Sequence, residues 1–148
     1  MGRSKKVPRI FEEGQVTIFK RTGTSFKGYE VLFILEKTID KKGTRYIHLE
    51  INIGATGAIY QSRYDYAEST FKQRIRGLSN KSYYEEMDKD QAKLEIVVST
   101  GKSLSMILQE AIANSKRSVN RRIDWYNKKI EQEKKQLDRL EKARSFIE

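Results

Sequence analysis

Three glutamates and one histidine are the residues of this chain that could support metal-dependent chemistry. Glu30, Glu36 and Glu50 lie in neighbouring predicted strands, and two carboxylates that approach each other across a hairpin could hold the metal ions of a nuclease. His48 is the only histidine and the chain has no cysteine, so a Cys–His pair and a site with several histidine ligands are excluded. A metal-dependent nuclease is therefore the weakest functional hypothesis. We expect no catalytic residue, no metal site and no cofactor.

A second candidate for chemistry is the segment Ser-Thr-Gly-Lys-Ser at residues 99–103. A strand, the sequence Gly-Lys-Ser and a helix, in that order, are typical of a phosphate-binding loop. The glycine that such a loop needs five positions before Gly101 is replaced by Ile96, which the predicted strand needs in its interior. We therefore interpret the segment as a turn in which Thr100 or Ser103 caps the following helix.

The basic residues of the chain point to a different chemistry, the binding of a polyanion. The 148 residues include 30 Lys and Arg against 20 Asp and Glu, a formal net charge of +10. Because clustered like charges repel one another and destabilise a fold, a partner rich in phosphate is the simplest source of compensation. Two clusters, in residues 1–9 and 116–129, are expected to contact phosphates. They contain Arg3, Lys5, Lys6, Arg9, Lys116, Arg117, Arg121, Arg122, Lys128 and Lys129.

Aromatic side chains in a predicted strand could add contacts to bases. Residues 45–53 alternate, so that Tyr46, His48, Glu50 and Asn52 face one way. Aromatic rings on an exposed sheet surface can stack on nucleobases. Tyr46 and His48 are therefore possible base-stacking residues, and the alternative is that these rings belong to the core.

The elements that would position these residues begin with an antiparallel sheet. The strand at residues 45–53 is expected to pair as a hairpin with an apolar strand at 29–37, because Asp40 and Gly43 supply turn chemistry between them. Two further strands and a short extended segment complete the predicted sheet. They are expected at residues 15–21, 94–98 and 58–60.

Two helices are expected outside the sheet. The first covers residues 64–77, where apolar residues recur at helical spacing and Gly77 could end the helix. Residues 79–92 are polar and indicate a loop or a short helix. The second helix begins near Ser103 and runs to the end of the sequence, because neither Pro nor Gly interrupts it.

The C-terminal helix changes its pattern after an apolar stripe at residues 104–112, which should pack on the sheet. A heptad repeat follows, in which most positions are apolar or aromatic. Such a repeat is typical of a coiled coil, so we expect a homodimer that forms through this helix. An intrachain helical hairpin with a break at residues 114–118 is the alternative. The two positions of the repeat hold Val119, Tyr126, Glu133, Leu140 and Ile147, and Ile123, Ile130, Leu137 and Arg144.

Part of the predicted hairpin resembles a family of nucleic-acid-binding proteins. The pattern consists of Phe26-Lys27-Gly28, an apolar strand ending in Glu36, a turn with Asp40 and Gly43, and Ile47-His48-Leu49. Within residues 26–49 the chain is similar to the single-strand-binding coactivators. That resemblance implies a curved antiparallel sheet followed by a helix that dimerises.

Together these features predict an α+β fold. It has an antiparallel sheet of four to five strands, one intermediate helix and a long C-terminal helix that extends as a coiled coil. We expect a flexible basic arm at residues 1–9, a core domain at 10–113 and a basic helical extension at 114–148. No apolar segment approaches the roughly 18 residues of a membrane span and no signal segment follows the basic N-terminus. We therefore expect a cytoplasmic protein without membrane contact.

The leading functional hypothesis is a small, non-enzymatic, dimeric nucleic-acid-binding protein. Single-stranded or structured nucleic acid is favoured over a specific duplex, because no duplex-reading motif is present, and DNA and RNA both stay open. The alternative is a protein-interaction module, such as an inhibitor or assembly factor of a phage or mobile element that acts on a nucleoprotein machine. Such a module would use the long helix or the acidic residues 85–90.

Overall fold

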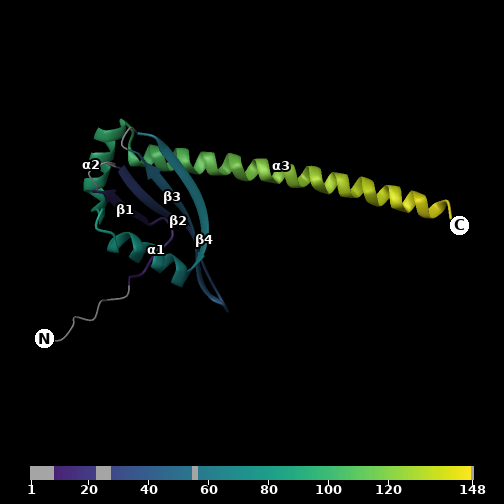
Figure 1. Cartoon of the computed structure of the whole chain (residues 1–148), viewed down its shortest axis with the longest axis horizontal. Coiled ribbons are helices and arrows are strands. Elements are labelled where there is room, and N and C mark those ends of the chain that lie inside the picture. Colours follow the sequence, from purple (N-terminus) through teal and green to yellow (C-terminus); the bar gives the residue numbers. More distant parts are fainter. Residues whose placement is uncertain (1–8, 23–27, 55–56, 148) are drawn as a thin grey trace. The chain divides into compact units, whose positions relative to one another are not determined.

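The described part of the chain folds into a five-stranded antiparallel sheet with three helices. The computed structural model describes residues 9–22, 28–54 and 57–147. The strand order across the sheet is β4-β3-β2-β1-β5. Figure 1 labels β1 to β4 and the three helices. The α+β class and the antiparallel sheet are as the sequence predicts. The strands are β1 (Val16–Arg21), β2 (Gly28–Asp40), β3 (Gly43–Ile53), β4 (Ile59–Ala67) and β5 (Tyr84–Glu86), and the helices are α1 (Glu68–Asn80), α2 (Lys89–Thr100) and α3 (Leu104–Ser145).

The hairpin of β2 and β3 forms the centre of the sheet, as predicted. Asp40 pairs with Gly43 at its tip, where Gly43 has a φ of 116° and the Asp40 carboxylate accepts a hydrogen bond from the Lys42 amide. An irregularity between Ile34 and Glu36 shifts the register by one residue. Neighbouring side chains in a strand point to opposite faces. The shift pairs Glu36 with Ile47, so the Glu36 side chain lies on the face opposite that of Glu30.

Both faces of the sheet are covered by helices. On one face, β-strand residues such as Val31 and Leu49 pack against Ala92 and Ile96 of α2 and against the first turns of α3. On the other face, a second buried cluster contains Leu32 together with side chains of α1. Three apolar residues of α1 recur at helical spacing and are buried there, which explains why this segment is a helix. They are Phe71, Ile75 and Leu78.

The strand predicted at residues 94–98 is wrong, because this segment lies within α2. The Asp88 carboxylate accepts hydrogen bonds from the amides of Asp90 and Gln91, and Gly101 ends the helix with a φ of 73°. Only Ala92 and Ile96 of the helix are buried, one turn apart. The run Leu-Glu-Ile-Val-Val looks like a strand locally, but the caps at both ends and the four-residue spacing of the buried pair favour a helix.

Three other boundaries also differ from the prediction. The extended segment expected at residues 58–60 is a nine-residue strand, β4, and it includes residues 64–67, where a helix was expected. Helix α1 continues through Gly77 to Asn80. Three of the polar residues between 79 and 92 form β5, which pairs with β1. Two helices therefore precede the long C-terminal helix, where the sequence predicts one.

Helix α3 has 42 residues without interruption, so the break at residues 114–118 that the alternative helical hairpin requires does not occur. At 1.5 Å per residue it measures about 63 Å. Ser103 caps its start, because its hydroxyl accepts a hydrogen bond from the Met106 amide. The first turns bury Leu104, Ile107 and Ala111. By its internal contacts the chain divides into two compact units, Met1–Ala111 and Ile112–Glu148. Across the described residues, no helix combines the length and the apolar character of a membrane span.

Candidate nucleic-acid interface

The positive charge of the chain is concentrated in two short segments. Residues 1–9 contain four Lys and Arg and no acidic residue, and residues 112–129 contain six against Asp124 alone. In contrast, residues 10–111 contain fifteen basic and fourteen acidic residues, and residues 130–148 contain five of each. Nearly all of the net charge of +10 therefore lies at the N-terminus and in the first half of the second unit.

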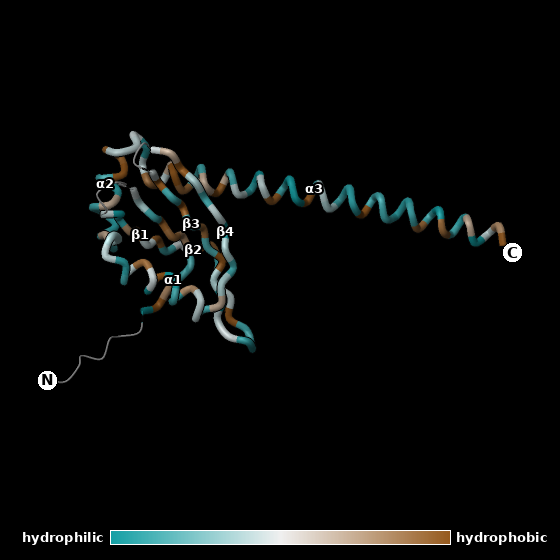
Figure 2. Tube along the Cα trace, viewed as in Figure 1, coloured by the Kyte–Doolittle hydropathy of each residue, from teal (hydrophilic) through white to brown (hydrophobic). Residues whose placement is uncertain are grey.

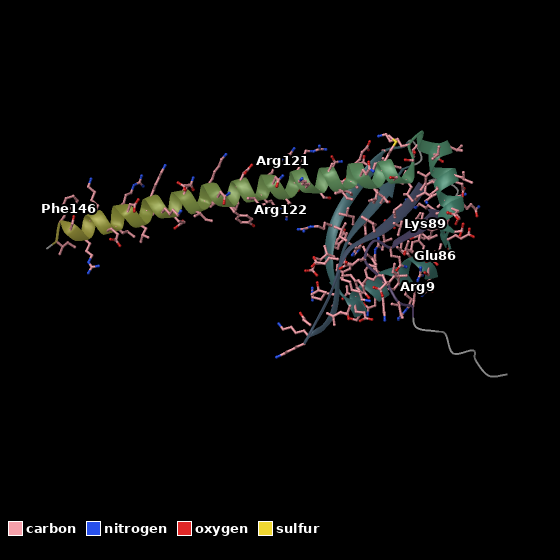
Figure 3. The ribbon with its side chains drawn as sticks, turned by 180° about the vertical axis from the view of Figure 1, so that it is seen from behind. Arg9, Glu86, Lys89, Arg121, Arg122 and Phe146 are labelled. Carbon is pink, nitrogen blue, oxygen red and sulfur yellow. The ribbon has the colours of Figure 1, made fainter. Side chains whose placement is uncertain are left out.

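The predicted basic arm can be described only at its last residue. Arg3, Lys5 and Lys6 lie outside the described residues. The Arg9 guanidinium lies 2.5 Å from the Glu86 carboxylate of β5 and 5.1 Å from the centre of the Phe11 ring (Figure 3). Arg9 thus anchors the chain to the edge of the sheet. Because its charge is already partnered, it has less to offer a phosphate than the sequence suggests.

The six basic side chains of residues 116–129 in α3 are exposed and form what we call the basic segment. Among the residues that the structure describes, none of the six has a carboxylate oxygen within 4.0 Å. Arg117 donates a hydrogen bond to Asn114, and Arg121 and Arg122 extend outward from the helix (Figure 3). Asp124 precedes Lys128 by four residues, but the two side chains form no ion pair. The basic segment therefore presents cations that the chain itself does not neutralise.

The only tryptophan of the chain lies in the middle of this basic segment. Trp125 is 55% exposed, although it is a large apolar residue. Its ring is 5.1 Å from the Tyr126 ring, edge to face, and the Lys129 ammonium lies 5.3 Å from its centre. On a helix, residues three and four positions apart are neighbours, so four cations surround this ring. They are Arg121, Arg122, Lys128 and Lys129.

Trp125 was not predicted as a site residue, although the sequence contains the signal. Four basic residues stand at the positions that a helix brings next to it, and no acidic residue stands at any of them. The sequence places these basic residues on a helix, and their spacing of three and four positions on either side of Trp125 is the signal that identifies the ring. A nucleobase can stack on an exposed indole while nearby cations hold its phosphates.

Tyr46 and His48 do not lie where base stacking would require them. Both are buried, with 2% and 0% of their surfaces exposed, beneath helix α1. The His48 ring is stacked at 5.6 Å from the Tyr64 ring and contacts the Phe71 ring edge-on at 4.9 Å. The predicted alternation of this strand is correct, but α1 covers the face that was expected to meet bases. Their assignment as base-stacking residues is therefore wrong for this fold.

The same covered face contains a buried polar cluster around Arg74 of α1. The guanidinium donates hydrogen bonds of 2.9 and 2.7 Å to the Glu50 carboxylate and lies 3.4 Å from that of Glu30. The Nε2 atom of His48 lies 3.2 Å from Glu50, and the Asn52 amide donates to Glu30 at 3.1 Å. Burial by itself would raise the pKa of Glu50, but the hydrogen bonds and charges of His48 and Arg74 outweigh it and lower that pKa below 4.5. Glu50 is therefore held as an anion.

This cluster joins the sheet to α1 and gives the nuclease hypothesis no support. Glu30 and Glu50 do approach each other, as predicted, but Arg74 occupies the position between them that a metal ion would need. Glu36 lies on the opposite face. Within the described residues, no group of three or more acidic or histidine side chains is placed to hold a metal ion. The electrostatic arrangement is that of an ion pair that fastens a helix to a sheet.

Two of the four acidic residues in positions 85–90, which the alternative hypothesis would use, serve the fold. Glu86 pairs with Arg9, and Asp88 caps α2. Beside them, the side chains of Arg21 and Lys81 lie within 6 Å of the Tyr83 and Tyr84 ring centres. Tyr83 is 40% exposed and could form a second, smaller aromatic and cationic surface.

Compared with protein-family models, with curated proteins and with solved structures, the chain matches none. The function is therefore inferred from the charge and geometry described above.

Proposed function

We propose that this protein is a non-enzymatic nucleic-acid-binding protein that holds phosphates with the basic segment of α3. The observation that supports this most directly is the charge of residues 112–129, which contain six basic residues and one acidic residue, Asp124. None of these six side chains forms an ion pair with a described carboxylate. Like charges at this density repel one another in the free protein. A nucleic-acid backbone relieves that repulsion and releases condensed counterions when it binds.

Single-stranded or looped nucleic acid fits this surface better than a continuous duplex. Trp125 is exposed among the cations, and a ring in that position can stack only on a base whose face is accessible. The phosphates of the same strand would meet Arg121, Arg122, Lys128 and Lys129. Arg3, Lys5 and Lys6 add a second electrostatic contact of the same kind.

The second half of α3 supports dimerisation as part of this function. Hydrophobic residues recur at intervals among hydrophilic ones along this half of the helix (Figure 2). The side chains of Tyr126, Ile130 and Leu137 are exposed and line a shallow depression. An exposed heptad of this kind is buried when two such helices pair. We propose a homodimer with a coiled coil, which doubles the number of cations that one strand can meet.

A salt titration tests the proposal. The protein is titrated into a labelled single-stranded oligonucleotide of mixed sequence, and anisotropy is recorded between about 50 and 200 mM salt. If all six basic side chains meet phosphates, log K should fall against log salt concentration with a slope near −4, from about −0.7 per phosphate contact. A slope near zero, or no binding at low salt, would contradict the proposal and favour the protein-interaction module.

A further inference from the structure

The exposed apolar side of α3 carries three charged residues within its repeat. Extending the heptad toward the N-terminus adds Lys116 and Ile112, and we call the resulting line of side chains the seam. Val119 is half-buried, and the other apolar members are between 43% and 87% exposed, so the chain itself leaves most of the seam uncovered. The seam consists of Ile112, Lys116, Val119, Ile123, Tyr126, Ile130, Glu133, Leu137, Leu140, Arg144 and Ile147.

The charges in the seam decide how a second copy can pair. In a parallel pair in register, each residue meets its own counterpart, so Lys116 would meet Lys116, and Glu133 would meet Glu133. Arg144 would meet Arg144 as well. Three layers of like charge would lie inside the interface, where repulsion is strongest. A parallel coiled coil is therefore disfavoured by the sequence of the seam itself.

An antiparallel pair removes this conflict. If Ile123 of one chain lies opposite Tyr126 of the other, the heptad brings Val119 opposite Ile130 and Ile112 opposite Leu137. The same alignment brings Lys116 opposite Glu133, so the charged layers become ion pairs. All eight layers across residues 112–137 are then apolar or oppositely charged. A second copy of the chain is therefore sufficient to explain why the seam contains Lys116 and Glu133.

We propose that two copies pair antiparallel across residues 112–137, and that this pairing joins their basic segments into one composite nucleic-acid site. The inference rests on the proposed function and adds the orientation and register of the dimer. The symmetry axis lies between Asp124 and Trp125, so the two tryptophans come close to it. The cations that surround each of them are brought together there. A single chain would carry only half of this site.

Bringing the two basic segments together also introduces charge repulsion within the dimer. Arg122 and Lys129 flank the seam on one side, and in the antiparallel pair Arg122 of each chain faces Lys129 of the other. This repulsion opposes pairing until a polyanion or salt screens it. We therefore expect dimerisation to strengthen when salt is raised without nucleic acid, and also when a single strand is added at low salt.

Cysteine cross-linking tests the orientation, and the absence of native cysteine makes the result clear. Full-length Val119→Cys and Ile130→Cys variants are oxidised separately and as a mixture. We expect disulfide-linked dimers in the mixture only, because in the proposed register each cysteine is about 16 Å from its own counterpart. Cross-linking of either variant alone, or of Ile130→Cys with Ile147→Cys in place of Val119→Cys, would overturn the inference.

Charge exchange provides a second test that does not depend on oxidation. Lys116→Glu or Glu133→Lys alone should weaken the dimer at least about tenfold in sedimentation equilibrium, and the double exchange should restore it. A double variant that stays as weak as the single ones would overturn the antiparallel register. If salt-dependent binding of the oligonucleotide persists while both tests fail, the proposed function stands and only the composite site is lost.

Discussion

The buried carboxylate of Glu50 stabilises the fold of a chain whose net charge is positive. Its anion is held by Arg74 from α1 and by His48 from its own strand. Breaking one partner of such a group leaves the others without compensation in a site that water hardly reaches. The cluster therefore contributes to stability, whereas the exposed cations of α3 contribute to binding.

Replacing Glu50 with Gln should destabilise the fold at neutral pH by about 2–3 kcal/mol. Because the pKa of Glu50 is lowered in the folded chain, its carboxylate stabilises the fold above pH 4.5 and loses this effect as the pH falls through the lowered value. The difference between the variant and the original chain should therefore shrink in acid. Urea unfolding at pH 7 and near pH 3.5 measures it, with the exposed Glu141→Gln as the control. An equal difference at both pH values would contradict this account.

The two lysine doublets of α3 offer a matched comparison of binding roles. Lys128→Gln/Lys129→Gln removes two charges from the basic segment, and Lys134→Gln/Lys135→Gln removes two from the half where charges balance. We expect the first variant to flatten the salt slope by about 1.4 and to weaken binding of all sequences alike. The second should change the slope much less. Equal effects in the anisotropy titration would show that only the total charge matters.

At the level of single residues, the sequence predicts which side chains share a face but not what covers it. The alternation through Tyr46 and His48 is correct, and yet both rings are buried because α1 packs over them. That packing depends on Phe71, Ile75 and Leu78, which are distant in sequence. Trp125 shows the reverse case. Its environment is set by residues within one helical turn, so it could have been predicted.

Among the secondary-structure elements, α2 is helical because of its capping residues more than because of the residues in its interior. Its longest apolar run favours a strand, and only two of its side chains are buried. Local pattern and local propensity cannot identify such a helix, whereas its capping residues can. The β2–β3 hairpin and α3 were predictable, because their periods are long and their turn or cap residues agree with them.

Replacing Asp88 with Ala should destabilise the chain by about 1 kcal/mol, because two amides at the start of α2 lose their acceptor. Denaturant unfolding followed by circular dichroism measures the change. Asp90→Ala, which removes a charge from the same turn but no cap, is the matched control and should cost less. If both variants lose the same stability, the charge at the helix start is more important than the hydrogen bonds.

For the whole molecule, the buried core and the basic segment of α3 consist of different residues. A variant should therefore be able to lose binding and still fold. The residues of both buried clusters end at Ala111. A chain that ends after residue 113 should therefore unfold cooperatively, bind the oligonucleotide far more weakly and lose most of its salt slope. The thermal transition and the same titration check this. Unchanged binding would assign the interface to the N-terminal residues or to the surface near Tyr83.

The outer border of the sheet has a consequence for how this protein behaves at high concentration. Strand β4 is the terminal strand on its side, and no described strand lies beyond its nine residues. Such a border can recruit a strand from a neighbouring molecule and seed fibrous aggregates. Arg63 is exposed along it, and Asp65 is engaged by Arg45 at 3.1 Å. These charges oppose strand pairing between molecules. Concentrated solutions of the protein should therefore stay clear, whereas those of the Arg63→Val/Asp65→Val variant should become turbid.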